Sequence, residues 1–238
     1  MNNEQARRYY NAFSGGYELE RHQGYHRWLD ERSVSIVAPL AENATVLEVG
    51  CGTGLILKEV APLADYAVGL DISAGMLSHA KERELNVIQS SATAIPFPDN
   101  HFDLVYSFKV LAHVPDIELA LREMARVLKP GGRLALEFYN RRSLRYLIRR
   151  IRPALEVGED TDESQMFTRF DDLSELKAKL PENLNFTGTA GLRVATVLPQ
   201  VFKLPALGQV WAGFEQLLSA SPLKAFGGFL VVLAQKQS

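Results

Sequence analysis

Three glycines at alternate positions, Gly50, Gly52 and Gly54, follow a short apolar run that contains the acid Glu48 near its end. Glycines let a backbone pass close to a ligand and adopt positive φ without steric cost. The apolar-rich residues 55–64 predict a helix, whose free N–H groups at its start favour a negative group such as a carboxylate. Glu48 would favour a cationic or hydrogen-donating group. The stretch therefore predicts a buried strand, a tight loop and a helix that bind a ligand carrying both kinds of group.

This stretch closely resembles the first motif of class I S-adenosylmethionine-dependent methyltransferases. The methionine part of S-adenosylmethionine carries both a carboxylate and an ammonium. The dinucleotide fingerprint G-x-G-x-x-G is not matched, because the third glycine comes one residue too early, and this disfavours a nicotinamide-dependent oxidoreductase. The resemblance implies that the cofactor S-adenosylmethionine contacts Glu48, Gly50, Cys51, Gly52 and Gly54. Cys51, between two glycines, is interpreted as a small filler rather than a nucleophile.

A second apolar run, residues 66–70, ends at the acid Asp71. An acid at the carboxyl end of a second parallel strand can accept hydrogen bonds from both ribose hydroxyls of a nucleoside. Residues 69–73 match the second motif of the family, and the resemblance adds Ile72 and Met76 to the cofactor site. The alternative is that Asp71 only caps the next helix, although Ser73 is itself a good N-cap there.

Residues 87–89 predict a third strand, which the turn residues Ser91, Ala92 and Thr93 follow. The family usually has an acid where Ser91 stands, and that acid bonds the exocyclic amine of adenine. A serine can accept one such bond but carries no charge. The resemblance implies that Ser91, Ala92 and Thr93, together with Phe108 after the fourth strand, line the cofactor site.

Residues 101–107 predict the fourth strand, and the loop 108–116 follows at its carboxyl end. Ligands of doubly wound sheets sit beyond the carboxyl ends of strands, so this loop should face the transferred methyl group. His113, the histidine of this loop, suits a general base or a substrate anchor, because its unperturbed pKa lies near working pH. The alternative is a hydrogen bond from His113 to the loop or cofactor. The family often has an acid directly before this histidine, where this chain has Ala112.

The remaining pattern predicts the elements that position these residues. An apolar stripe of helical period over residues 117–128 predicts a core-packed helix, and the Lys-Pro-Gly-Gly run at 129–132 ends it. Residues 133–138, 193–198 and 227–235 predict the last three strands, and the last of these is continuously apolar over residues 229–234. The resemblance covers roughly residues 44–140. It implies an α/β, doubly wound, seven-stranded and mostly parallel sheet, whose antiparallel last strand enters between the fifth and sixth.

The length of 238 residues predicts one large domain or a domain with an appendage. We expect residues 1–43 to form an N-terminal helical lid segment, with Tyr10 closing over the cofactor, and residues 44–238 to form the methyltransferase domain. A helix that only packs on the domain is the alternative for the lid. Within the domain, residues 141–185 are expected to form an insertion that builds the substrate pocket.

Composition limits the partners. A formal net charge of −2 argues against bulk attraction to nucleic acid. The single cysteine excludes an intrachain disulfide and a cysteine-rich zinc site. The polar N-terminus resembles no signal peptide and no apolar run reaches the roughly 18 residues of a membrane span, so a cytoplasmic protein is expected. Residues 141–152 are basic with one apolar face, which predicts either a solvated helix or a surface that makes a weak contact with anionic lipid head groups or meets a phosphorylated substrate.

The sequence therefore predicts transfer of a methyl group from S-adenosylmethionine to a small, partly apolar molecule by in-line attack. Two alternatives stay open. One is a non-catalytic S-adenosylmethionine- or nucleoside-binding protein with the same fold, which the residues Ser91 and Ala112 would favour. The other is an RNA or protein methyltransferase, for which an added module or a basic domain would be expected. The sequence does not indicate the acceptor or an oligomeric state.

Overall fold

The computed structural model describes residues 3–18, 24–151 and 167–238. Its helices are α1 (Asn3–Phe13), α2 (Gly24–Ala41), α3 (Leu57–Val60), α4 (Ala74–Glu82), α5 (Ile117–Val127), α6 (Leu144–Ile151), α7 (Leu173–Lys179) and α8 (Pro205–Ala220). The strands are β1 (Thr45–Val49), β2 (Tyr66–Asp71), β3 (Val87–Gln89), β4 (Phe102–Ser107), β5 (Leu128–Tyr139), β6 (Leu184–Leu192) and β7 (Phe229–Lys236). Short 3₁₀ turns include η2 (Leu111–His113), η4 (Pro199–Lys203) and η5 (Pro222–Phe226).

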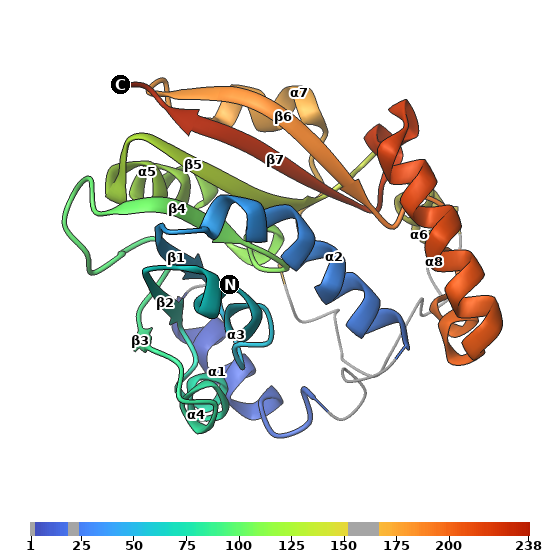
Figure 1. Cartoon of the computed structure of the whole chain (residues 1–238), viewed down its shortest axis with the longest axis horizontal. Coiled ribbons are helices and arrows are strands. Elements are labelled where there is room, and N and C mark those ends of the chain that lie inside the picture. Colours follow the sequence, from blue (N-terminus) through green and yellow to red (C-terminus); the bar gives the residue numbers. More distant parts are fainter. Residues whose placement is uncertain (1–2, 19–23, 152–166) are drawn as a thin grey trace.

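The strands form one seven-stranded sheet in the order β3-β2-β1-β4-β5-β7-β6 (Figure 1). The pairs among β1 to β5 are parallel. β7 runs antiparallel to both β5 and β6, between which it lies. The predicted fold is therefore confirmed, including the place of the last strand. β7 is apolar and almost wholly buried from Phe229 to Ala234, as a strand covered on both faces must be.

Helices cover both faces of the sheet. On one face, residues such as Leu121 and Met124 of α5 pack against Leu47 of β1 and its neighbours. On the other face, Trp28 and Val37 of α2 pack with residues of α3 and the alternate positions of the same strands. Because side chains alternate along a strand, each strand supplies both cores. This double layer fixes the carboxyl ends of β1, β2 and β4, where the candidate site lies.

The sixth strand differs from the prediction. The sequence indicated residues 193–198, whereas β6 is Leu184–Leu192 and pairs with β7 alone. Arg193 has a φ of 58°, a left-handed conformation that interrupts an extended strand. The backbone N–H groups of Val194, Ala195 and Thr196 all donate to the Glu215 carboxylate of α8. These donors are consequently unavailable for sheet pairing, which places the strand earlier in the chain.

The helix after the glycine loop is also shorter than predicted. The sequence indicated a helix from Leu55, but α3 begins at Leu57, ends at Val60 and continues only as a 3₁₀ turn, Ala61–Leu63. Pro62 lies inside that turn, and a proline cannot supply the N–H of a longer helix. Elsewhere the caps follow the sequence, because the Ser73 side chain accepts the backbone N–H of Met76 and so caps α4.

Within the described ranges, no helix has the length and apolar character needed to cross a lipid bilayer. The expected insertion at 141–185 contains α6 and α7, and its residues 152–166 lie outside the described part of the chain. Of the expected N-terminal segment, residues 1–2 and 19–23 also lie outside it. The division of the chain into these segments stays a prediction.

Candidate functional site

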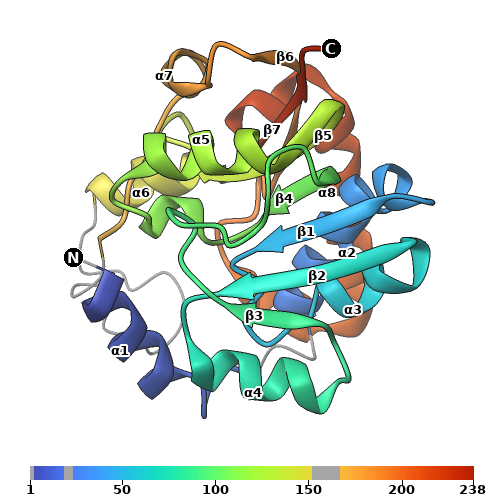
Figure 2. The same ribbon diagram turned by 90° about the vertical axis from the view of Figure 1, so that its left-hand side faces the viewer.

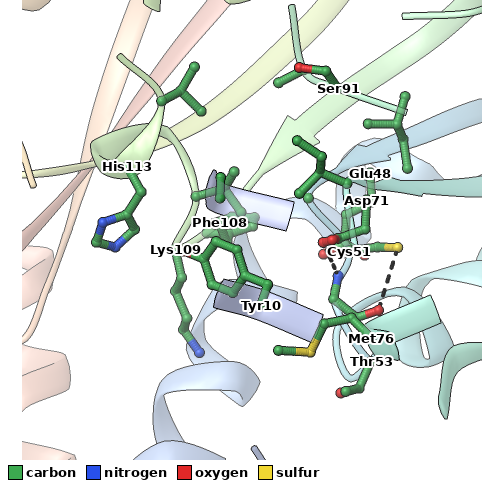
Figure 3. Close-up of a pocket in the computed structure, with 18 of the residues that line it drawn as sticks. Tyr10, Glu48, Cys51, Thr53, Asp71, Met76, Ser91, Phe108, Lys109 and His113 are labelled. Carbon is green, nitrogen blue, oxygen red and sulfur yellow. Dashed lines mark hydrogen bonds between the residues drawn. The ribbon is translucent and has the colours of Figure 1, made fainter. Parts of the chain in front are cut away.

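A pocket opens at the carboxyl ends of β1 and β2 and is bounded by the segments that follow β3 and β4. In Figure 3, Glu48 and Asp71 lie on one side and His113 on the other, with Tyr10 and Phe108 between them in this view. α1 lies beyond the strand ends (Figure 2) and contributes Tyr10 to the pocket wall. Of the residues predicted from sequence, the wall contains Tyr10, Glu48, Gly50, Cys51, Gly52, Asp71, Ile72, Met76, Ser91, Ala92, Phe108 and His113.

The glycine loop has the backbone conformation that its sequence predicts. Gly50 and Gly52 have φ values of 78° and 55°, which favour glycine. A Cβ at Gly50 would lie 2.2 Å from Cγ2 of Val110, whereas a Cβ at Gly52 would meet nothing within 4 Å. Gly50 therefore permits close packing against the loop after β4, and Gly52 leaves its backbone open to the pocket.

Two predicted residues, Gly54 and Thr93, lie outside the pocket wall. A Cβ at Gly54 would come within 2.4 Å of Leu85 Cδ1, so this glycine allows the loop to pack against the segment after α4. The Thr93 hydroxyl lies 2.8 Å from the Ser91 hydroxyl, and the Thr93 N–H donates to that same oxygen. Gly54 and Thr93 thus contact residues next to the pocket rather than the pocket itself. Direct contact of either residue with a cofactor stays a prediction.

The Asp71 carboxylate joins the glycine loop to the start of α4. Its Oδ2 accepts the backbone N–H of Gly52 at 2.9 Å, and its Oδ1 accepts that of Ser73 at 2.8 Å. Burial raises the pKa of the Asp71 carboxyl, and these backbone hydrogen bonds partly oppose the rise. Each carboxylate oxygen has about two lone-pair sites. Both oxygens can therefore accept a further bond, as the two hydroxyls of a ribose would require.

Glu48 is a buried acid at the end of β1, with 2% of its surface exposed. The Tyr106 hydroxyl of β4 donates to its Oε2 at 3.1 Å. Burial raises the pKa of Glu48 well above its usual range, the Tyr106 hydrogen bond opposes this, and the neighbouring Asp30 and Asp71 add to the rise. A cationic ligand group beside Glu48 would favour the ionised carboxylate. The site is therefore suited to an ammonium.

Cys51 packs beneath the loop and over Gly69, where an added Cβ would lie 2.6 Å from Sγ. Burial raises the pKa of the Cys51 thiol well above its usual range, and the carboxylates of Glu48 and Asp71 act in the same direction. The thiolate is the nucleophilic form of cysteine. A thiol held protonated in this way agrees with the interpretation of Cys51 as a filler.

His113 lies at the far side of the pocket, in η2. Its Nδ1 lies 3.0 Å from the carbonyl oxygen of Phe167, and its Nε2 lies 3.4 Å from the Tyr139 hydroxyl. A carbonyl only accepts, so Nδ1 must carry the proton in this contact, and a neutral ring then accepts from Tyr139 through Nε2. His113 is thereby oriented by both neighbours, which favours an anchoring role, and a role as general base stays a prediction.

A charged group beneath the loop after β4 was missed by sequence reasoning. Lys109 and Asp30 both line the pocket and form an ion pair between this loop and α2. Lys109 has a φ of 62°, and its backbone N–H donates at 3.0 Å to Oε1 of Glu137 on β5. Asp30 and Lys109 are 79 positions apart. Only the folded sheet brings these residues together, and no local spacing signals the contact.

We expect Glu137 to make stability depend on pH. Burial raises the pKa of its carboxyl from 4.5 to about 7, opposed by Lys109 and Arg145 and reinforced by Asp30. Between these values the folded state keeps a proton that the unfolded state releases, so stability falls as pH rises. The loss attributable to Glu137 is about 3 kcal/mol. Urea unfolding of wild type and Glu137→Gln from pH 4.5 to 7.5 should show the two stabilities diverging by about that amount.

The matched control is Glu118→Gln, because Glu118 is exposed on α5. Its stability difference from wild type should stay constant over the same pH range. A constant difference for Glu137→Gln as well would contradict the proposed burial of a protonated carboxyl.

α1 is attached to the first turn of α4 through Asn11. Its Oδ1 accepts the Ser73 hydroxyl at 2.7 Å and the Gly75 backbone N–H at 3.0 Å. Gly75 allows this approach, because a Cβ there would lie 2.5 Å from Ser14 Oγ. None of the 11 residues of α1 is buried. Such an attachment suits a segment that covers a ligand and detaches again, and the lid role stays a prediction.

Comparison with known proteins supports the resemblance. Residues 47–136 match the family described as "Methyltransferase domain". A demethylmenaquinone methyltransferase of Corynebacterium urealyticum is 41% identical over 97 residues, covering 41% of this chain and 42% of that protein. A sterol 24-C-methyltransferase of Gibberella zeae is 32% identical over 200 residues, covering 72% of this chain and 52% of that protein. The chain thus spans about half or less of the length of these curated relatives.

The fold is shared with a crystal structure of a S-adenosylmethionine-dependent methyltransferase from Thermotoga maritima, at a TM-score of 0.69 and 20% identity. The superposition covers 96% of this chain and 98% of that one. At this identity the likeness shows the fold alone. Together with the family match over residues 47–136, the sheet order and the glycine loop show that this chain contains a class I S-adenosylmethionine-dependent methyltransferase domain.

Proposed function

We propose that the protein transfers a methyl group from S-adenosylmethionine to a small, partly apolar molecule. The observation that carries this proposal is the meeting of two buried acids, Glu48 and Asp71, in one pocket at the ends of neighbouring parallel strands. The glycine loop lies between them in the chain. Membership of the family implies the cofactor, whose ammonium, carboxylate and ribose match these groups.

The residues of the pocket fit this cofactor. The open space over Gly52 allows a ligand to approach the backbone. The Thr53 hydroxyl is buried without a hydrogen-bond partner among the described residues, and a buried polar atom of this kind needs a partner. Glu48 would hold the ammonium and Asp71 the ribose hydroxyls. Ser91 would accept from the adenine amine, although its oxygen already accepts the Thr93 N–H.

When bound, S-adenosylmethionine supplies an electrophilic methyl group on a positively charged sulfur. The main task of the protein is then to hold the acceptor in line with that methyl, and good orientation can lower a barrier by up to about 7–11 kcal/mol. A base is needed only if the attacking atom carries a proton at working pH. His113 is the residue proposed for this role or for anchoring the acceptor, because it ends η2 and lines the pocket.

The acceptor is proposed to be partly apolar for two reasons. Aromatic side chains, Tyr10, Tyr17 and Phe108, contribute to the pocket wall. The relatives reported above are named for a demethylmenaquinone and a sterol. The net charge of −2 does not favour a nucleic-acid substrate. A small-molecule acceptor is therefore proposed over RNA.

Calorimetric titration tests the cofactor assignment. We expect S-adenosylmethionine and its demethylated product S-adenosylhomocysteine to bind, and NAD not to bind, because only the former pair matches Glu48 with an ammonium. Binding of NAD in place of S-adenosylmethionine would contradict the proposed function.

A methyl-transfer assay distinguishes an enzyme from a non-catalytic protein with the same fold. Purified protein with radiolabelled S-adenosylmethionine and fractionated small-molecule extracts should give a labelled product in at least one fraction. Cofactor binding without any labelled product would favour the non-catalytic alternative, which the absence of an acid at Ser91 and Ala112 motivates.

We also propose that α6 contacts anionic lipid surfaces. Leu144 and Leu147 are 42% and 53% exposed on this helix, and Arg142 and Arg150 are exposed beside them. We expect the protein to co-sediment with anionic vesicles more than with zwitterionic ones, and salt to weaken binding. Equal binding to both vesicle types, or unchanged binding of an Arg142→Glu/Arg150→Glu variant, would contradict the contact. Arg152 of the basic stretch lies outside the described residues.

A further inference from the structure

Three polar atoms from three different elements are buried without a hydrogen-bond partner in the described part of the chain. They are the hydroxyl of Tyr25 on α2, Oε2 of Glu137 on β5 and Nη1 of Arg145 on α6. Arg193 lies over the Tyr25 ring, 5.0 Å from the centroid, but no described group meets the distance and angle of a hydrogen bond with the Tyr25 hydroxyl. A buried polar atom without a partner is costly, so three in one region need an explanation.

Arg145 lies over an aromatic surface formed by β5 and β7. The Arg145 guanidinium lies 5.1 Å from the ring centroid of Tyr139 and 5.3 Å from that of Phe229. Tyr139 and Phe229 are cross-strand neighbours on β5 and β7, with centroids 5.3 Å apart. Tyr25 packs in the same hydrophobic cluster as Tyr139 and Phe229, and Glu137 lies two residues before Tyr139 on β5, on the same face of the sheet. The three unpartnered atoms therefore belong to one group.

This group adjoins the proposed methyl-transfer pocket at two points. The Tyr139 hydroxyl lies 3.4 Å from Nε2 of His113, which lines the pocket. Lys109, which also lines the pocket, donates its backbone N–H to the other oxygen of Glu137 at 3.0 Å. The group thus adjoins the pocket through Tyr139 and through the loop after β4. Figure 3 shows His113 and Lys109, the two pocket residues contacted, away from Glu48 and Asp71.

Oε2 of Glu137 and Nη1 of Arg145 do not bond each other, since neither atom has a hydrogen-bond partner among the described residues. An acceptor atom and a donor atom held apart in this way match a ligand group that does both. A hydroxyl is such a group, because its hydrogen can donate to Glu137 Oε2 while its oxygen accepts from Arg145 Nη1 or from Tyr25. The rings of Tyr139 and Phe229 beside it offer the flat apolar surface that an unsaturated ring would contact.

We propose that Tyr25, Glu137 and Arg145 form the acceptor-recognition subsite, and that it takes a hydroxyl group carried on a flat, largely apolar ring. This proposal rests on the proposed methyltransferase function, since it names the class of its second substrate. It also explains why α6, in the expected substrate-side insertion, turns Arg145 inward over two aromatic rings. The subsite is distinct from the cofactor residues Glu48 and Asp71.

The test is a binding experiment that needs no turnover. Protein saturated with S-adenosylhomocysteine is titrated with naphthol and, separately, with the methyl ether of naphthol, which keeps the ring and removes the donor. We expect naphthol to bind at least about tenfold more tightly than the ether, as one charge-assisted hydrogen bond implies. Equal affinity of the two probes for the wild type, or no binding of naphthol, would overturn the proposal without any mutant.

Three variants sharpen the assignment. Glu137→Gln, Arg145→Met and Tyr25→Phe should each weaken naphthol binding, the first two about tenfold, while the affinity for S-adenosylhomocysteine stays unchanged. Arg122→Met is the control, because Arg122 is exposed on α5, and it should bind both ligands like the wild type. Circular dichroism of each variant shows that it is folded. Wild-type naphthol affinity in both Glu137→Gln and Arg145→Met would overturn the subsite.

The outcomes separate this proposal from the proposed function. If S-adenosylhomocysteine itself fails to bind, the methyltransferase function is contradicted, and the naphthol and ether titrations of the unliganded protein still decide whether the subsite recognises a hydroxyl. If S-adenosylhomocysteine binds and the two probes do not differ, the function stands and the subsite is wrong.

Discussion

Replacing Asp71 by alanine is expected to weaken the binding of S-adenosylhomocysteine by about 1.5–3 kcal/mol, the usual contribution of hydrogen bonds to a charged group. This corresponds to roughly a ten- to 150-fold rise in Kd. The reason is geometric. Asp71 lines the pocket at the end of β2, and both of its oxygens keep a free lone-pair site after bonding Gly52 and Ser73. Calorimetric titration of wild type and variant measures the effect directly.

The control for this prediction is Asp65→Ala. Asp65 is an exposed acid directly before the opposite end of β2, and its removal changes net charge by the same amount. It should leave the affinity unchanged. Thermal unfolding of Asp71→Ala shows whether the loss of the Gly52 and Ser73 contacts also lowers stability. Wild-type affinity in a folded Asp71→Ala protein would mean that this acid only joins the loop to α4.

The largest expected effect on stability is at Glu215, which is fully buried on α8. Its carboxylate accepts the backbone N–H groups of Val194 at 2.8 Å and Ala195 at 2.9 Å, and both the N–H and the hydroxyl of Thr196. Glu215→Ala would leave the two Thr196 donors buried without a partner, and the Val194 and Ala195 N–H groups part-buried without one. A buried group of this kind costs about 1–3 kcal/mol. Because water can reach the part-buried donors of Val194 and Ala195, we expect a total loss of about 3–5 kcal/mol in the free energy of unfolding.

Urea unfolding at neutral pH measures this loss. Gln216→Ala is the control, because Gln216 follows Glu215 on the same helix and is exposed. That control should change the free energy of unfolding by less than about 0.5 kcal/mol. Glu215→Gln keeps one acceptor oxygen, so its loss in the free energy of unfolding should lie between those of Gln216→Ala and Glu215→Ala. A loss below 1 kcal/mol for Glu215→Ala would show that the loop finds other partners.

The parts of the fold that the sequence predicts are those encoded by short local patterns. The strands that end at Val49 and Asp71 are predictable because buried strands consist mainly of apolar residues. The glycines after Val49 are predictable as a loop because positive φ angles favour glycine. β6 was misplaced because its residues 184–192 include Gly188 and Gly191, which weaken any strand signal. What excludes residues 193–198 from the sheet is Glu215, some 20 positions further along the chain.

The same distinction applies to the candidate site. Residues on the loops after β1 and β2 were predicted and do line the pocket, because the resemblance covers those loops. The ion pair of Lys109 with Asp30, and the carboxyl of Glu137, could not be predicted, because each depends on contacts between distant parts of the sheet. At Ser91 the sequence shows that the usual acid of the family is replaced by a serine. It does not show that the serine oxygen already accepts a hydrogen bond from the Thr93 N–H.

The attachment of α1 has a consequence for the kinetics of turnover. The two hydrogen bonds of Asn11 to Ser73 and Gly75 contribute about 1–3 kcal/mol together, and α1 buries no residue of its own. The same segment also contacts the domain through a hydrogen bond of Asn3 to Thr93 and an ion pair of Glu18 with Arg83. Release of α1 would break the two Asn11 hydrogen bonds to the turn of α4 that follows Asp71. We predict that departure of the spent nucleoside is coupled to release of α1 through Asn11, because this residue bonds the turn of α4 that follows Asp71.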